Sequence, residues 1–132
     1  MSVSLGLATA ADVPALAALT ARGAHDPLSE EQLLAECQRP YAHMITATMG
    51  ETGLVGYVLY WHVADEVEIH DMVVDPDHRR RGLGRAMFQQ VISTAKTERC
   101  SHIVLDVRET NVAAIALYRS LGCESVGTRP NY

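Results

Sequence analysis

The sequence lacks the features of several common functional classes. No apolar run approaches the roughly 18 residues that cross a bilayer, and no basic segment followed by an apolar one opens the chain. We therefore expect no membrane partner and a cytoplasmic location. The cysteines, Cys37, Cys100 and Cys123, are odd in number and match no metal-ligand spacing. They predict free thiols in a reducing compartment, and no bound metal is expected.

Basic charge is also scarce. Lysine and arginine number 11 against 16 aspartates and glutamates, and the net charge is −5. A nucleic-acid-binding face needs a broad basic surface, so no nucleic-acid partner is expected. The 132 residues, of which 48% are hydrophobic, suit one small globular domain spanning residues 1–132.

The basic charge that is present is concentrated between Asp75 and Met87, which read Asp-Pro-Asp-His-Arg-Arg-Arg-Gly-Leu-Gly-Arg-Ala-Met. A strand-like run precedes this stretch, and an apolar stripe at helical spacing follows it: Leu83, Met87, Val91 and Ala95. In such a strand-to-helix turn, glycines let backbone N–H groups converge on an anion, and the helix adds its positive dipole end. The stretch therefore predicts a polyphosphate site.

The spacing of the glycines narrows the choice of polyphosphate ligand. A Walker A loop needs Lys and then Ser or Thr after its last glycine, but Arg85 follows Gly84 here. A dinucleotide fingerprint needs a third small residue where Met87 stands. The pattern that fits is Arg/Gln-x-x-Gly-x-Gly/Ala, carried by Arg79, Gly82 and Gly84. It resembles the pyrophosphate loop of the GNAT acetyltransferases, which bind coenzyme A.

Periodicity elsewhere predicts an α/β fold with a mixed sheet. Three strands at hairpin spacing predict antiparallel pairing, and the strand–helix–strand crossover around the glycine turn predicts parallel pairing. The expected strands are 3–8, 41–49, 54–62, 67–74, 101–107 and a short 124–129. The expected helices are 11–22, 30–38, 82–97 and 111–121.

This order of elements resembles the GNAT fold over the whole chain, and it is closest to the RimI branch. RimI enzymes acetylate the amino-terminal alanine of a ribosomal small-subunit protein. Three further stretches carry the likeness: Leu105–Arg108 with Asn111, Ala113–Tyr118 with Leu121-Gly122, and Arg129–Tyr132. In the family a last strand follows the Asn-Tyr pair, which here is Asn131-Tyr132. The resemblance therefore implies a sheet lacking that strand, with an exposed edge at which a second copy could form a homodimer.

The resemblance also implies the site residues. The general base falls on Asp106, where RimI enzymes have glutamate, and the general acid falls on Tyr118. Leu28 replaces a tryptophan common in the acceptor-side loop. Acetyl-CoA contacts fall on Met72, Val73, Val74, Arg79, Arg80, Arg81, Gly82, Leu83, Gly84, Arg85 and Asn111.

The chemistry of these residues agrees with acetyl transfer. Tyrosine, with an ordinary pKa of about 10, can donate to a thiolate whose conjugate acid lies near 8.5. Asp106 is shorter than glutamate, so we expect it to act through a water. Glu68 and His70, expected on the same strand face as Met72, are alternative bases.

The reaction expected is attack of an amine on the acetyl-CoA thioester. An α-amino group is about 10% neutral at pH 7, against well under 0.1% for lysine, so the amino terminus of a protein or peptide, in the RimI branch a ribosomal protein, is the expected acceptor. Two alternatives stay open. One is a small amine, drawn by Glu66, Glu68 and Asp71, and the other is a non-catalytic acyl-CoA-binding module.

Overall fold

The computed structural model describes residues 3–24, 26–105 and 112–122. Within these ranges one five-stranded sheet has the order β1-β2-β3-β4-β5. The first four strands pair antiparallel and β4 pairs with β5 in parallel, which confirms the predicted mixed sheet. The predicted strand at 124–129 and the family's last strand lie outside the described residues. The strands are β1 Val3–Leu7, β2 Ala42–Met49, β3 Gly53–Val63, β4 Glu66–Val74 and β5 His102–Leu105.

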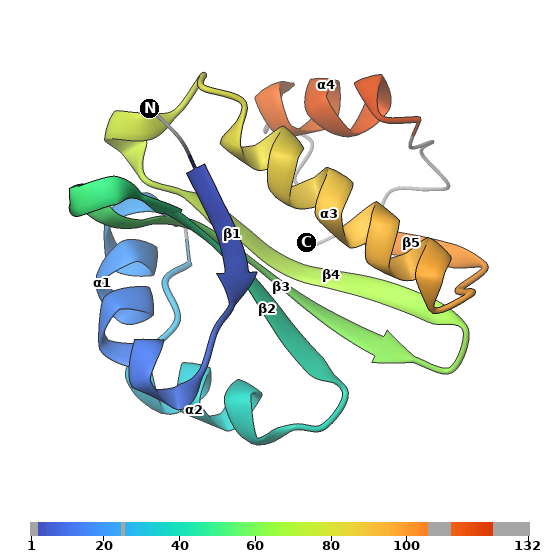
Figure 1. Cartoon of the computed structure of the whole chain (residues 1–132), viewed down its shortest axis with the longest axis horizontal. Coiled ribbons are helices and arrows are strands. Elements are labelled where there is room, and N and C mark those ends of the chain that lie inside the picture. Colours follow the sequence, from blue (N-terminus) through green and yellow to red (C-terminus); the bar gives the residue numbers. More distant parts are fainter. Residues whose placement is uncertain (1–2, 25, 106–111, 123–132) are drawn as a thin grey trace.

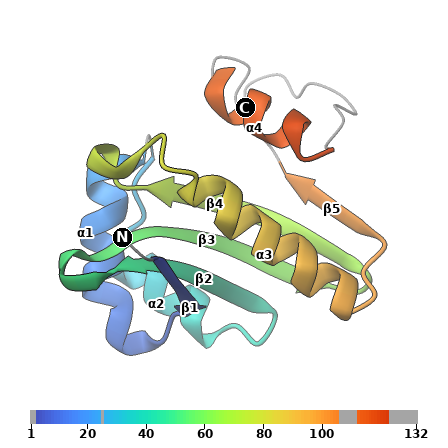
Figure 2. The same ribbon diagram turned by 45° about the horizontal axis from the view of Figure 1, so that its top comes forward.

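The helices cover the sheet on both faces. Figures 1 and 2 show α1 and α2 against one face and α3 and α4 over the other. The Ser29 hydroxyl accepts from the Gln32 N–H in a capping box that begins α2 at the predicted position, residue 30. The helices are α1 Val13–Gly23, α2 Glu30–Gln38, α3 Leu83–Thr97 and α4 Val112–Ser120.

Each face of the sheet has its own apolar core. The stripe predicted for α3 is buried against the strands, with Leu83, Met87, Val91 and Ala95 all at most 3% exposed. On the other face Val13, Leu16 and Leu19 of α1 pack with Leu33 of α2. Each buried leucine, valine or methionine among them contributes about 1.5–3 kcal/mol, so the two cores fix both helix layers to the same strands.

A β-bulge in β4 changes which side chains share a face. Tyr60 pairs with Ile69 and Leu59 pairs with Asp71, so His70 is the additional residue. Ile69 and Met72 therefore both pack on the α3 side, while Asp71 lies on the α1 side.

The bulge corrects one expectation from the sequence. Glu68 pairs with Trp61, whose indole N–H donates to Glu36 of α2 at 2.9 Å. The His70 ring stacks on Trp61 with centroids 4.1 Å apart. Glu68 and His70 thus lie on the α2 side of the sheet, and the prediction that they share a face with Met72 is wrong.

Other expectations concern the cysteines and the membrane. Cys37 and Cys100 are free thiols, as predicted, and Cys123 lies outside the described residues. Among the residues that the structure places, no histidine, cysteine and carboxylate group has the arrangement of a metal site. None of the described helices combines the length and apolar character required to span a membrane.

Candidate functional site

The turn between β4 and α3 has a fixed and unusual backbone. Asp75 caps a short turn at Pro76–His78, where its carboxylate accepts from the Asp77 N–H at 2.9 Å. Arg80 and Gly82 then adopt left-handed conformations, with φ of 65° and 78°. Such a conformation is costly for arginine and easy for glycine. The chain thereby reverses and enters α3 directly after Gly82.

The first turn of α3 offers the anion site that the sequence predicts. The Ala86 N–H donates to the Gly82 carbonyl at 3.0 Å. The preceding N–H groups of the helix have no intrahelical carbonyl to bind, and the positive dipole end lies there. A Cβ added at Gly84 would lie 3.4 Å from Leu117 of α4, so α4 passes close to this turn. These features fit a pyrophosphate.

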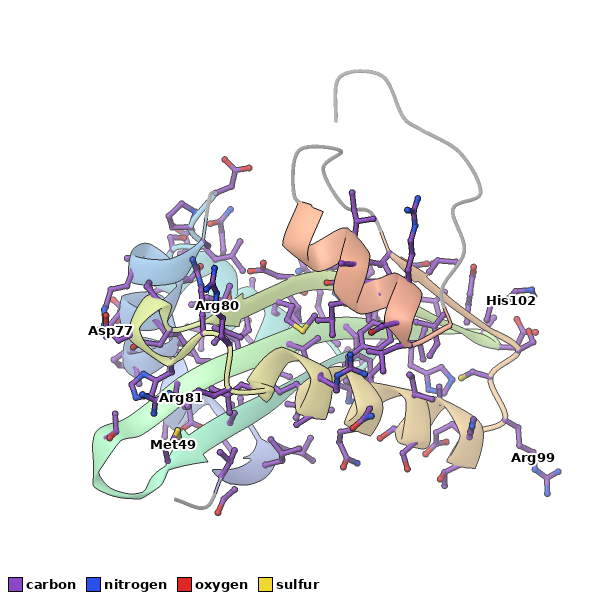
Figure 3. All side chains as sticks on the ribbon, turned by 90° about the horizontal axis from the view of Figure 1, so that it is seen from above. Met49, Asp77, Arg80, Arg81, Arg99 and His102 are labelled. Atoms are coloured by element: carbon purple, nitrogen blue, oxygen red, sulfur yellow. The ribbon has the colours of Figure 1, made fainter. Side chains whose placement is uncertain are left out.

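The four arginines of the turn divide into two pairs. Arg79 donates to the Gly23 carbonyl at the end of α1 at 2.8 Å, and Arg85 donates to the Ser120 hydroxyl of α4 at 2.7 Å. Within the described ranges, Arg80 and Arg81 have no ion pair and their side chains are exposed. Figure 3 shows both at the end of the molecule where α3 begins, far from Arg99 and His102. Arg80 and Arg81 are therefore the arginines available to an anion.

An ion pair that the sequence analysis missed holds this turn against α1. Arg22 contacts the buried Asp75 carboxylate at 2.8 Å and the exposed Asp77 carboxylate at 3.3 Å. Burial alone would raise the pKa of Asp75. The Asp77 N–H, the charge of Arg22 and the nearby His78 outweigh it and hold that pKa below its usual range. The Asp-Pro pair did signal a turn, but no sequence pattern links positions 53 residues apart.

Within the described part of the chain, β4 has an open side next to this turn. β5 pairs with it only from Glu66 to Ile69, so 70–74 have no partner on that side among the described residues. Met72 and Val74 pack toward α3, whereas Val73 is buried on the α1 side. Of the three predicted cofactor contacts on β4, two therefore share the face of the anion site.

Tyr118 lies on that same face. It is half-buried on α4, packs on the core under α3, and its ring centroid is 5.2 Å from that of Phe88. Asp106 and Asn111, the predicted base and a predicted cofactor contact, lie outside the described residues. The structure therefore shows where Tyr118 lies, and the catalytic roles of Tyr118 and Asp106 both stay predictions.

The α1 side of β4 carries a buried polar pair that the sequence analysis did not connect. The fully buried Tyr57 hydroxyl donates to Asp71 at 2.6 Å. Burial raises the pKa of both groups. The same tyrosine also forms a hydrogen bond with Thr20 of α1. Thr20 in turn accepts from the Leu28 N–H at 3.2 Å. Alternation in β3 could have predicted an inward Tyr57, but not its partner.

Comparison with known proteins accounts for this arrangement. The model of the Acetyltransferase (GNAT) family matches residues 13–123. The chain belongs to the GNAT acetyltransferase family. GNAT enzymes use acetyl-CoA, which agrees with an anion site at the start of α3.

Similar relatives include a ribosomal-protein alanine N-acetyltransferase and an N-alpha-acetyltransferase. The [ribosomal protein bS18]-alanine N-acetyltransferase of Escherichia coli K12 is 32% identical over 121 residues, covering 92% of this chain and 80% of that protein. The N-alpha-acetyltransferase RimI of Mycobacterium tuberculosis is 35% identical, covering 98% and 84%. A crystal structure of the E. coli ribosomal-protein-S18-alanine N-acetyltransferase superposes with a TM-score of 0.86 at 30% identity, covering 92% and 77%.

Proposed function

We propose that this GNAT protein transfers the acetyl group of acetyl-CoA to the amino-terminal α-amino group of a protein, and that a ribosomal protein beginning with alanine is its substrate. The observation that carries this proposal is the identity, over more than nine-tenths of the chain, to two named enzymes: 32% to a ribosomal-protein alanine N-acetyltransferase and 35% to an N-alpha-acetyltransferase. The site geometry supports it through the anion site, the open side of β4 and the tyrosine beside it.

Acetyl-CoA as substrate would engage residues already placed. Its pyrophosphate would accept from the N–H groups at the start of α3, with Arg80 and Arg81 adding charge. Its acyl end would lie along the open side of β4, at Met72 and Val74. Arg79 and Arg85 support this site from their bonds to Gly23 and Ser120, and their direct contact with the cofactor stays a prediction.

The amine then attacks the thioester carbonyl and coenzyme A leaves as the thiol. Tyr118 is the proposed acid, because it lies on the α3 face with Met72 and its hydroxyl can protonate a thiolate. The base stays open. Asp106 is the proposal from the RimI resemblance, and Glu68 and His70 lie on the opposite face, 3.2 Å from each other.

The experiment is thiol release from acetyl-CoA with a peptide that begins with alanine. We expect turnover in the parent protein, and a fall in kcat of ~10²-fold in Tyr118→Phe, as expected for the loss of a general acid. The Phe variant keeps the ring beside Phe88, so acetyl-CoA affinity should hold. Tyr41→Phe, at an exposed tyrosine on the other face, is the matched control and should retain parent activity. Unchanged kcat in Tyr118→Phe would remove that residue from the mechanism.

A small amine is the second candidate acceptor, because Glu68 and Asp71 give β4 negative charge on the α1 and α2 side. Spermidine in the same assay tests it. A higher kcat/KM for spermidine than for the peptide would replace the proposed acceptor, and tight acetyl-CoA binding without turnover of either would indicate an acyl-CoA-binding module.

A further inference from the structure

The Asp71 carboxylate is hydrogen-bonded to a buried tyrosine, an arrangement that packing of the core alone does not require. It lies directly after the bulged His70, on the α1 side of β4. Its oxygen accepts at 2.6 Å from Tyr57, whose side chain is wholly buried. Moving a carboxylate out of water costs free energy unless the carboxylate is paired. Buried carboxyl groups with a shifted pKa are therefore frequent at functional sites. Here the partner is a neutral phenol, so the negative charge itself is not neutralised by this contact.

The position of Asp71 relates it to the proposed reaction. It is two residues beyond Ile69, the last residue of β4 that pairs with β5. The next residue, Met72, packs on the opposite face with the core that Tyr118 also contacts. Asp71 and Tyr118 therefore lie on opposite faces of the sheet. A planar thioester placed at the open stretch of β4 would meet the acid from one side and an incoming amine from the other.

We propose that Asp71, held by Tyr57, binds the acceptor ammonium and takes its first proton. This inference rests on the proposed function and adds an acceptor-binding residue to it. The ammonium loses one proton to the Asp71 carboxylate, and the C–N bond forms as the C–S bond breaks. The second proton leaves the nitrogen as the thiolate gains one, so coenzyme A departs as the thiol. Asp71 returns its proton to water.

The surroundings of Asp71 support this role. Burial raises the pKa of its carboxyl, which brings its proton affinity closer to that of an amine. Within residues 3–24, 26–105 and 112–122, its titratable contact is Tyr57 on β3, and Glu68 and His70 precede it on β4. From α1, the uncharged Thr20 hydroxyl contacts Tyr57 of this pair.

The same hydrogen bonds reach the loop between α1 and α2. Thr20 interacts with Tyr57 and accepts from the Leu28 N–H, so a single network joins Asp71 to the segment between α1 and α2.

The test measures kcat/KM for the alanine peptide, and for spermidine, in the parent, Asp71→Asn and Tyr57→Phe. Asparagine can still accept from Tyr57, so unfolding temperature and acetyl-CoA affinity should match the parent. We expect kcat/KM for the better amine to fall ~10²-fold. Glu31→Gln, at an exposed carboxylate on α2, is the control and should keep parent kinetics.

The Tyr57→Phe variant gives a readout that a merely structural role would not move. The Tyr57 hydrogen bond favours the carboxylate and lowers the pKa of Asp71, so its removal raises that pKa. The acid limb of the kcat/KM profile should move to higher pH, by roughly half a unit to one unit. Near-parent kcat/KM in Asp71→Asn, or an unmoved limb in Tyr57→Phe, would overturn the role of Asp71 alone. A parent protein inactive on both amines would overturn the proposed function together with it.

Discussion

At the scale of single residues, the site depends on a few buried polar groups whose partners are distant in the sequence. Asp75 accepts from the Asp77 N–H and pairs with Arg22, while Asp71 accepts from Tyr57. In both cases a carboxylate on or beside β4 is fixed by a group from another element. These contacts hold the two ends of the open stretch of β4 in place.

Asp75→Asn should destabilise the fold at neutral pH by about 1–3 kcal/mol. The substitution removes the negative charge that pairs with Arg22 and replaces one of the two buried acceptor oxygens of the carboxylate. The pKa of Asp75 is depressed in the folded state. Its stabilisation is therefore present above the ordinary aspartate pKa of about 3.9 and is lost as pH falls toward the folded value. Urea unfolding at neutral and acid pH should show a flatter acid dependence in the variant.

Asp77→Asn is the matched control for that series. Its carboxylate also contacts Arg22 but is 80% exposed, and exposed pairs contribute little. Equal losses in the two variants would contradict the assignment of the ion-pair energy to Asp75.

At the scale of elements, much of the fold could be predicted because local patterns determine it. The Ser29–Gln32 capping box set the start of α2, and the apolar stripe of α3 set its buried face. The bulge at His70 could not be predicted, because a strand with one additional residue has the same kind of composition as a regular strand. That single residue moved Glu68 and His70 to the other face. The Arg22–Asp75 pair was hidden for another reason, since it joins elements with no shared periodicity.

The contact of α1 with β4 is tight enough to test by adding one methyl group. A Cβ at Gly23 would lie 2.9 Å from both Val73 Cγ1 and the Val74 carbonyl oxygen. A backbone atom cannot rotate away, so Gly23→Ala should cost about 1–3 kcal/mol in unfolding free energy. Gly6→Ala, where the nearest atom is 3.9 Å away, should change stability far less. Similar urea midpoints for the two variants would contradict this packing.

The loop arginines should separate by role. Arg80→Gly removes a charge while allowing the left-handed φ of 65°, and it should weaken acetyl-CoA binding about 3–10-fold with little loss of stability. Arg79→Gln instead removes the bond to Gly23 and should lower the unfolding temperature. Calorimetric titration and thermal unfolding measure both effects. The reverse pattern would assign the cofactor contact to Arg79.

At the scale of the whole molecule, an acidic body of net charge −5 presents one basic turn. The glycine spacing and the Tyr118 position were predictable because a short motif and a family resemblance fixed them. The Tyr57–Asp71 pair was not, because strands bring its members together. A homodimer through a sheet edge stays a prediction, and sedimentation against 14.4 kDa tests it.

The most direct test of the account is where the acetyl group goes. The protein is incubated with acetyl-CoA and a peptide that begins with alanine and carries an internal lysine, and fragment masses locate the modification. The account predicts acetyl on the α-nitrogen of alanine, and none when that nitrogen is blocked beforehand. Acetyl on the lysine side chain, or equal labelling of the blocked peptide, would contradict it.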